Sequence, residues 1–358
     1  MQITSKQRVM AAVAHKTTDR TPITFDAQAE VFDALYKHFG HRSRERLFDA
    51  LHCDTWMVSP KKVLPPGAPK DGKSTIWGWH TVTAYYTGGK YEEVSWSPLA
   101  GKDELSDIDK HNWPDLSSLD FSHFPAEIEA HKDRAIIAPW SLGSYFVASY
   151  VRGMENLMMD FAANPAYAEK LIRTITERVL ALLDKMLDGY GTGIDIVYMA
   201  DDTCSQLGPL FSPDTFKRMV VPYLREIVAH VHRHDKKFLL HTCGSVRTFL
   251  PMIIECGVDM LEPIQIRAEG MDPRNLKRDF GKHLCFYGGV DLQQVLRRGT
   301  PQTVADEVRR LIDILGEGGG YIVGPGHTYI QVDASLENIL AMYQAAYEHR
   351  AATPGNSR

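Results

Sequence analysis

Short apolar runs that alternate with stretches of helical period constrain this chain more than any other feature of its sequence. Such runs, separated by amphipathic segments, are typical of parallel strands covered by helices. Eight of them with intervening helices favour a (β/α)8 barrel, whose core of ~250 residues fits within this chain. No Gly-x-Gly-x-x-Gly follows the first run, so a doubly wound dinucleotide-binding sheet lacks support. The expected strands are residues 22–26, 54–59, 135–140, 195–201, 237–241, 258–262, 284–288 and 321–325.

The sequence also predicts two additions to the barrel. Residues 1–21 are expected to contain an N-terminal helix that is capped by Thr4 or Ser5. Residues 74–99 are rich in aromatic and β-branched side chains on both sides of Gly88-Gly89, which predicts an inserted β-hairpin.

Proline and glycine mark two helix boundaries. Ser212-Pro213 is expected to begin a helix, with a kink at Pro222, where proline removes a backbone donor. Thr300-Pro301 is expected to begin another, with Thr300 as the capping residue and proline in the first turn.

Composition limits the class of protein. The chain has 358 residues and a net charge of −5 without any Lys/Arg-rich block, so nucleic acid is not an expected partner. No apolar run approaches the ~20 residues of a membrane span, and the polar N-terminus lacks a signal peptide's apolar core. Five unclustered cysteines indicate reduced thiols, hence a cytoplasmic protein. We expect residues 1–350 to form one domain and the polar tail 351–358 to be disordered.

Good metal ligands follow several of the expected strands. His241 and Cys243 lie two residues apart directly after the run Phe238-Leu-Leu240, and Glu262 and His327 follow later runs. Alone, His-x-Cys is weak evidence, because a buried cysteine often behaves as a small hydrophobe. The carboxyl ends of barrel strands share one rim, however, and this rim holds the active site in the fold. The recurrence therefore predicts a zinc site.

Several segments resemble the uroporphyrinogen decarboxylase superfamily, and the resemblance is densest from about 195 to 345. It implies a (β/α)8 barrel. It also implies one of two activities, decarboxylation or zinc-dependent methyl transfer with a corrinoid protein. The segments are Tyr198-Met-Ala-Asp-Asp, Gln206-Leu-Gly-Pro-Leu-Phe-Ser-Pro, Leu240-His-Thr-Cys-Gly-Ser, Gly257-Val-Asp-Met-Leu-Glu-Pro-Ile-Gln, Phe286-Tyr-Gly-Gly-Val-Asp, Gly318-Gly-Gly-Tyr-Ile and Leu336-Glu-Asn-Ile.

The methyltransferase branch is the more similar of the two. The decarboxylases carry Arg-Gln-Ala-Gly-Arg-Tyr near the first strand, whose arginines hold substrate carboxylates, whereas this chain has the acidic residues Asp26 and Glu30 there. The methyltransferases resemble it in the His-x-Cys, in a glutamate after strand six and in a further ligand after strand eight. That last ligand is usually cysteine after Pro-Gly, and here it is His327.

The resemblance implies a function and a set of partners. We expect one Zn²⁺ per chain, held by His241, Cys243, Glu262 and His327. One thiolate and one carboxylate leave the ion formally neutral and suited to polarise oxygen, which favours an O-methyl donor and a cobalamin acceptor on a separate corrinoid protein. Transfer to a thiol is the sister activity. A decarboxylase is the runner-up, a non-catalytic tetrapyrrole-binding barrel is a third reading, and a homodimer is an option.

Other rim residues receive roles in this hypothesis. Asp202, Gln265 and Asp291 are expected to be catalytic, although loop carboxylates are often simple helix caps. For the aromatic residues of the substrate set, core packing is the competing role, and for Arg152 it is a helix-surface ion pair rather than a carboxylate clamp. The substrate-binding set is Asp26, Trp140, Arg152, Gln206 and Tyr287.

Overall fold

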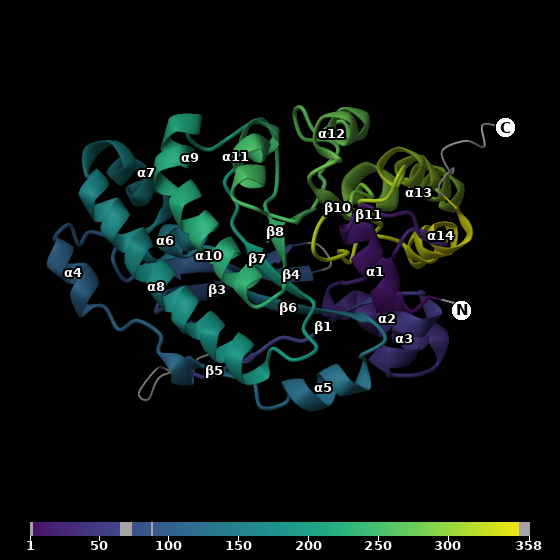
Figure 1. The fold of residues 1–358 in the computed structure, drawn as a ribbon, viewed down its shortest axis with the longest axis horizontal. Coiled ribbons are helices and arrows are strands. Elements are labelled where there is room, and N and C mark those ends of the chain that lie inside the picture. The colour runs from purple at the N-terminus through teal and green to yellow at the C-terminus, as the bar shows by residue number, and fades with distance from the viewer. Residues whose placement is uncertain (1–2, 65–73, 87–88, 351–358) are drawn as a thin grey trace.

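Seven parallel strands form the curled sheet at the centre of the molecule (Figure 1). The computed structural model describes residues 3–64, 74–86 and 89–350. Each strand pairs with the next in the order β1-β6-β7-β8-β9-β10-β11, which is the order of a (β/α)8 barrel. The bounds are β1 (Thr55–Met57), β6 (Ala135–Leu142), β7 (Ile196–Ala200), β8 (Lys237–His241), β9 (Met260–Glu262), β10 (Cys285–Tyr287) and β11 (Tyr321–Ile322).

Helices surround this sheet, and among them α8 and α10 lie side by side on its outer face, as do α13 and α14 (Figure 1). No helix of the described part is both long and apolar enough to cross a membrane. The helices are α1 (Ser5–Val13), α2 (Ala29–Phe39), α3 (Arg44–Ala50), α4 (Leu105–Lys110), α5 (Phe124–Ala130), α6 (Ser144–Arg152), α7 (Met154–Ala163), α8 (Pro165–Tyr190), α9 (Pro213–Met219), α10 (Val221–Arg233), α11 (Leu250–Glu255), α12 (Pro273–Phe280), α13 (Pro301–Leu315) and α14 (Leu336–Glu348), with the short helical segments η1 (Leu116–Ser118), η2 (Arg247–Phe249) and η3 (Leu292–Leu296).

The first expected strand, residues 22–26, is not a regular strand but a segment that closes the barrel between β1 and β11. Thr24 N–H donates to the Val323 carbonyl (3.0 Å), and Asp54 N–H donates to the Ile23 carbonyl (2.7 Å). The ladder stays short because Pro22 has no N–H and because Ile23 N–H donates to the Asp54 side chain (2.8 Å) instead of to a strand. This segment takes the place of the eighth strand.

Helix α1 plugs one end of the barrel. Of the two predicted capping residues, Thr4 is the cap, and its side chain accepts from Gln7 N–H. Val9, Ala12 and Val13 are buried and pack in one cluster with side chains that point into the barrel. The inward side chains of this cluster are Ala135, Ile137, Ile196, Leu239, Met260, Cys285, Tyr287 and Ile322. The interior is therefore a packed core at this end, and any site must lie at the other.

The inserted hairpin and both predicted helix starts are present. Strands β3 (His80–Tyr86) and β4 (Gly89–Trp96) pair antiparallel, while part of the expected turn, residues 87–88, lies outside the described residues. Two further short strands, β2 (Lys61–Lys62) and β5 (Leu119–Asp120), also pair antiparallel.

The two capping residues act as expected, but one helix is divided. Ser212 accepts from Thr215 N–H and Thr300 accepts from Thr303 N–H. The expected kink at Pro222 is wrong: α9 ends at Met219 and a new helix, α10, begins at Val221. Proline cannot donate to the preceding turn, so the chain restarts its helix with Pro222 in the first turn of α10.

A buried ion cluster centred on Asp54 holds the barrel closed. The Asp54 side chain is completely buried and pairs with Arg8 (2.7 Å), from α1, and with Arg20 (2.6 Å), which precedes the closing segment. The same carboxylate accepts the Ile23 N–H (2.8 Å). One carboxylate thus joins the plug helix, the closing segment and the start of β1.

We predict that Asp54→Asn lowers the free energy of unfolding by about 3–5 kcal/mol, because it removes the buried counter-charge of Arg20 and leaves Arg8 with only the half-exposed Asp19. Urea unfolding measures the change. The matched control is Asp33→Asn, which breaks an exposed pair whose side chains are 59% and 79% exposed, and it should cost less than about 1 kcal/mol. Equal effects of the two substitutions would contradict the role given to Asp54.

Candidate metal centre

The inward side chains change from apolar to polar along the strands. Successive inward positions are two residues apart, so Leu239 and His241 share a face of β8, as do Met260 and Glu262 of β9. His241 and Glu262 are paired in register as the last residues of their strands. Both side chains are buried, at the end of the barrel opposite α1. Strand pairing alone therefore places an imidazole beside a carboxylate.

Three side chains from two strand ends form a group with ligand atoms close together. Cys243 Sγ lies 3.4 Å from His241 Nε2, and Asp202 Oδ1 lies 3.5 Å from the same nitrogen. These three ligand atoms lie within 4.8 Å of one another. Imidazole, thiolate and carboxylate are the ligand types of zinc sites, so the donor set fits a Zn²⁺ ion.

The backbone after β8 directs Cys243 into this group. Cys243 N–H donates to Asp202 Oδ1 (2.7 Å), which ties the loop to the end of β7. Gly244 has φ +88°, and a Cβ on it would lie 2.4 Å from the Ser205 carbonyl oxygen. Only glycine fits such a close approach in this conformation. The glycine of His-Thr-Cys-Gly is thus needed to bring the thiol back over His241.

Glu262 contacts the other nitrogen of His241. Its carboxylate accepts from Nδ1 in a short contact, and the Thr328 hydroxyl lies 3.2 Å from Nδ1 and 3.3 Å from Glu262 Oε1. A proton held on Nδ1 leaves the Nε2 lone pair facing Cys243 and Asp202. This is the arrangement in which a carboxylate orients a metal-binding histidine. The geometry therefore places Glu262 at Nδ1 and Asp202 at Nε2, and the binding of a metal ion by Glu262 or Asp202 stays a prediction.

Burial and negative charge dominate the electrostatics. Burial alone would lower the pKa of His241, but Glu262 and Cys243 outweigh it and raise that pKa well above its usual value. Burial, together with Asp202 and Glu262, raises the pKa of the Cys243 thiol despite the opposing effect of His241. Burial also raises the pKa of Asp201 to about 7, with Asp202 adding to it. The mouth of the barrel, which is the end at the carboxyl ends of the strands around His241, has a surplus of acidic groups. A bound cation would compensate their negative charge.

His327 lies beside the group but not in it. Its ring is 6.1 Å from the His241 ring, centre to centre, and perpendicular to it. Burial lowers the pKa of His327, so it is neutral and able to act as a ligand. It lines two cavities, one of about 100 Å³ on the side of Gln265 and a smaller one on the side of Asp26.

The structure brings most of the other expected residues to these cavities. Gln265 donates to Cys243 Sγ (3.5 Å) and accepts from Gly244 N–H (2.8 Å), and Gln206 donates to Gln265. Asp291 lines the larger cavity but caps η3 through the Gln293 and Gln294 amides and pairs with Arg267 (2.7 Å). Its carboxylate is therefore occupied, and it presents Arg267 at the rim.

The three remaining expected substrate-binding residues have different positions relative to the cavities. Tyr287 is buried, contacts the Thr24 hydroxyl and lines the smaller cavity. The side chain of Trp140, in β6, lies outside the described residues. Arg152 is not brought to the site: its guanidinium is buried, pairs with Asp160 (2.7 Å) and with Asp103 (2.8 Å), and also donates to two backbone carbonyls. All its donors hold α6 in place, so none is free to clamp a substrate.

The sequence analysis gives no separate role to two residues at or near the site. Thr328 touches both His241 and Glu262 from the loop after β11, and a lone threonine beside a histidine has no characteristic spacing. Asp201 accepts the Phe146 N–H (2.8 Å) beneath the start of α6, whereas its neighbour Asp202 is half-buried and faces His241. Only the folded loops distinguish these two adjacent aspartates.

Residues 135–349 match the model of the uroporphyrinogen decarboxylase (URO-D) family. The match covers more than half of the chain, so the protein belongs to the URO-D family. A methyltransferase from Methanosarcina mazei has a similar solved structure, with a TM-score of 0.67 at 19% identity, over 97% of this chain and 99% of that one. This likeness supports the barrel fold.

Curated relatives fall in both branches of the family. A methylated-thiol–coenzyme M methyltransferase of Methanosarcina mazei is 26% identical over 216 residues, 59% of this chain and 53% of the relative. A methylcobamide:CoM methyltransferase of Methanosarcina barkeri is 27% identical over 186 residues, 51% and 49% of the two chains. A uroporphyrinogen decarboxylase of Neisseria meningitidis is 24% identical over 201 residues, 53% and 51%. The matches span about half the length of these relatives.

We predict that Cys243→Ala removes a metal ion from the mouth and that Glu262→Gln weakens its binding by about 10–100-fold, because an orienting carboxylate tunes a ligand without bonding to the ion. Asp202→Asn should weaken binding more than Glu262→Gln does. With Co²⁺ as the probe, thiolate-to-cobalt absorption reports this site. The control is Cys256→Ala, a buried thiol in another part of the fold. A loss with Glu262→Gln as complete as that with Cys243→Ala would make Glu262 the ligand instead.

We predict that Asp26→Asn gains stability relative to the parent protein as the pH rises from 4 to 7. Burial raises the pKa of folded Asp26 from 3.8 to about 6, so the folded state disfavours its charge. Between pH 3.8 and about 6, Asp26 is ionised in the unfolded chain but protonated in the folded protein, so the free energy of unfolding of the parent protein falls over this range. The variant has no group that titrates at this position and keeps its stability. The difference should reach about 3 kcal/mol at most. Urea unfolding of metal-free protein at both pH values tests this, and a pH-independent difference would contradict it.

Proposed function

We propose that the protein is a metal-dependent methyltransferase that moves a methyl group between a small methylated substrate and a corrinoid carried by a separate protein. The observation that supports this most is the group of His241, Cys243 and Asp202 at the barrel mouth. In a family that contains both decarboxylases and methyltransferases, a thiol–imidazole–carboxylate group is suited to hold zinc. When bound, the ion would stabilise negative charge that develops on a substrate oxygen or sulfur.

The chain's own residues orient and surround the substrate. Glu262 and Thr328 hold the His241 ring, and Asp202 holds the Cys243 loop. Gln265 and Gln206 present amide groups at the cavity beside the thiol. Arg267, whose side chain is 58% exposed, stands at the rim of the same cavity and pairs with Asp291. A cavity of about 100 Å³ holds only a few heavy atoms, which favours a small substrate group at the metal.

The charges at the mouth count against decarboxylation of uroporphyrinogen. That substrate carries several carboxylates, and a site for it needs cations. Of the described residues that line the two cavities, Arg267 alone has a permanently charged cationic side chain, whereas Asp26, Glu262 and Asp291 carry carboxyl groups. A polyanionic substrate would be repelled by these groups.

Oxygen and sulfur remain the two substrate classes. Cys243 and Asp202 supply one thiolate and one carboxylate, so a divalent ion held by them stays formally neutral and attracts an oxygen strongly. We therefore favour an O-methyl donor. The names of the two Methanosarcina relatives refer to coenzyme M, which makes a thiol the second candidate. Both reactions proceed at the same residues and differ in direction relative to cobalt.

The corrinoid is assigned to a partner because the chain lacks the usual Asp-x-His-x-x-Gly of a corrinoid-binding site. The reacting cobalt must then approach through the mouth at the carboxyl ends of the strands. The alternative of a non-catalytic binding barrel has no use for the group of three metal ligands.

We predict that the metal-loaded protein converts Co(I) corrinoid to methyl-Co(III) in the presence of a methoxylated aromatic compound or a simple methyl ether. Absorbance of the corrinoid measures the reaction. His241→Ala should lower the rate at least about 100-fold, since it removes a ligand rather than an orienting group. His283→Ala, at a position outside both cavities, is the matched control and should retain the rate.

Three outcomes separate the alternatives. Methyl transfer only from methylcobalamin to a thiol would move the assignment to the sister activity. Formation of coproporphyrinogen from uroporphyrinogen would establish the decarboxylase reading. Loss of all methyl transfer with metal-loaded protein, free cobalamin and corrinoid proteins encoded beside the gene would overturn the proposal.

A further inference from the structure

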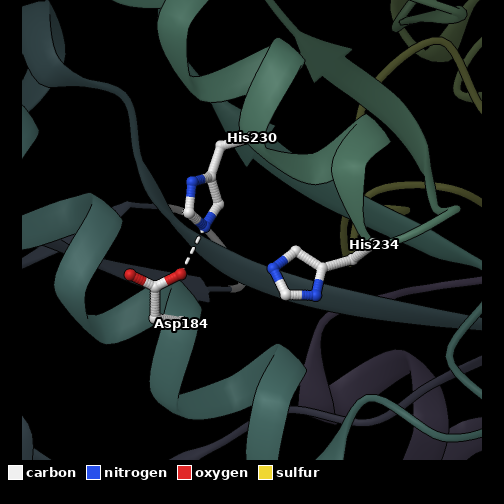
Figure 2. A group of neighbouring side chains, drawn as sticks. All are labelled: Asp184, His230 and His234. Atoms are coloured by element: carbon white, nitrogen blue, oxygen red, sulfur yellow. Dashed lines mark ion pairs between the residues drawn. The ribbon is translucent and has the colours of Figure 1, made fainter.

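Two histidines and an aspartate meet on the outer face of the barrel, between α8 and α10. Figure 2 shows Asp184 of α8 facing His230 of α10, with His234 directly after the last turn of α10. Residues four apart lie on one face of a helix, so His230 and His234 point to the same side. His234 precedes β8, whereas His241 ends it. The two groups therefore lie at opposite ends of that strand.

The three side chains have the spacing of metal ligands. His230 Nε2 lies 2.6 Å from Asp184 Oδ1, and the two imidazole rings are 5.4 Å apart, centre to centre. One ligand atom of each residue lies within 4.8 Å of the others. No thiol takes part in this group.

A buried nitrogen in this group has no hydrogen-bond partner. The His230 side chain is only 10% exposed, and its Nε2 makes no hydrogen bond although Asp184 is close. The carboxylate oxygen thus lies away from the direction in which an N–H at Nε2 would point. A buried polar atom without a partner is costly, and a ligand that it binds would remove the cost.

We propose that Asp184, His230 and His234 form a second metal site, for a divalent ion of borderline softness such as Zn²⁺. Two imidazoles and one carboxylate suit such an ion, and water completes the shell. The ion would link α8 to α10, which also meet through side-chain packing, the Arg173–Glu226 pair and a hydrogen bond from the Tyr223 hydroxyl to the Glu169 carbonyl. The site is independent of the proposed methyl transfer.

Two neighbouring charges influence the site. Exposed Arg233 donates to His230 Nδ1 (2.5 Å), and Asp188 lies 3.7 Å from His234 Nδ1. An Nδ1 that accepts a hydrogen bond places the ring proton on Nε2, where the ion must bind. Metal binding therefore requires Arg233 to swing into solvent and the proton to move to Nδ1. It follows that Arg233 weakens binding, both by this hydrogen bond and by its charge.

The test uses Zn²⁺ titrated against a chelating dye, with the Cys243→Ala protein to exclude the mouth. We expect this protein to bind about one equivalent of Zn²⁺. Adding His234→Ala should remove that equivalent, and so should adding Asp184→Asn, whose side chain is 48% exposed and can change without disturbing the fold. His232→Ala is the matched control on the same helix, because His232 pairs with Asp259 instead. Arg233→Gln should tighten binding.

Co²⁺ provides a second readout in the parent protein. A thiolate-to-cobalt band reports the mouth, while the second site adds d–d absorption without such a band. Failure of the Cys243→Ala protein to bind Zn²⁺ would overturn this proposal and leave the mouth site untouched. Binding that survives both His234→Ala and Asp184→Asn would overturn it as well. Loss of the thiolate band alone would count against the mouth and not against this site.

Discussion

The carboxylate of Asp54 is the contact on which the closed barrel depends. It is fully buried, and it pairs with Arg20 before the closing segment and with Arg8 of the plug helix, whose charge Asp19 also balances, while it accepts the Ile23 N–H. Both arginines depend on this carboxylate, since its removal would leave Arg20 unpaired in the interior and Arg8 with Asp19 alone. The closing segment has almost no strand ladder of its own, so this cluster joins the two ends of the sheet.

Closure determines where the chemistry can lie. Helix α1 fills one end of the barrel with Val9, Ala12 and Val13, and inward side chains pack above it. The polar layer then falls at the carboxyl ends of the strands, where His241 and Glu262 are paired in register. Parallel strands hold that register rigidly, whereas the loops beyond them adjust. For this reason the strand ends fix the imidazole, and the loops bring the thiol and Asp202 to it.

The two nitrogens of His241 face different groups. Nδ1 faces Glu262 and Thr328, which orient the ring, and Nε2 faces Cys243 and Asp202. In the similar group on the outer face, Asp188 lies near Nδ1 of His234, but Arg233 rather than a carboxylate contacts Nδ1 of His230 and competes with metal binding there. The contrast illustrates that a set of ligands and its surroundings together decide how a site binds an ion.

The sequence by itself determined the order of strands and helices, the helix starts at Ser212 and Thr300, and the gathering of His241, Cys243 and Glu262 at one rim, because apolar periodicity and turn chemistry are local. It also identified the family. Only the tertiary structure decided that residues 22–26 close the barrel with almost no ladder, that the helix divides at Val220 instead of kinking at Pro222, and that Arg152 is enclosed by Asp160 and Asp103. It likewise decided that Asp202, rather than Glu262, faces Nε2, because the side of an imidazole that each carboxylate reaches depends on distances between loops that are far apart in the chain.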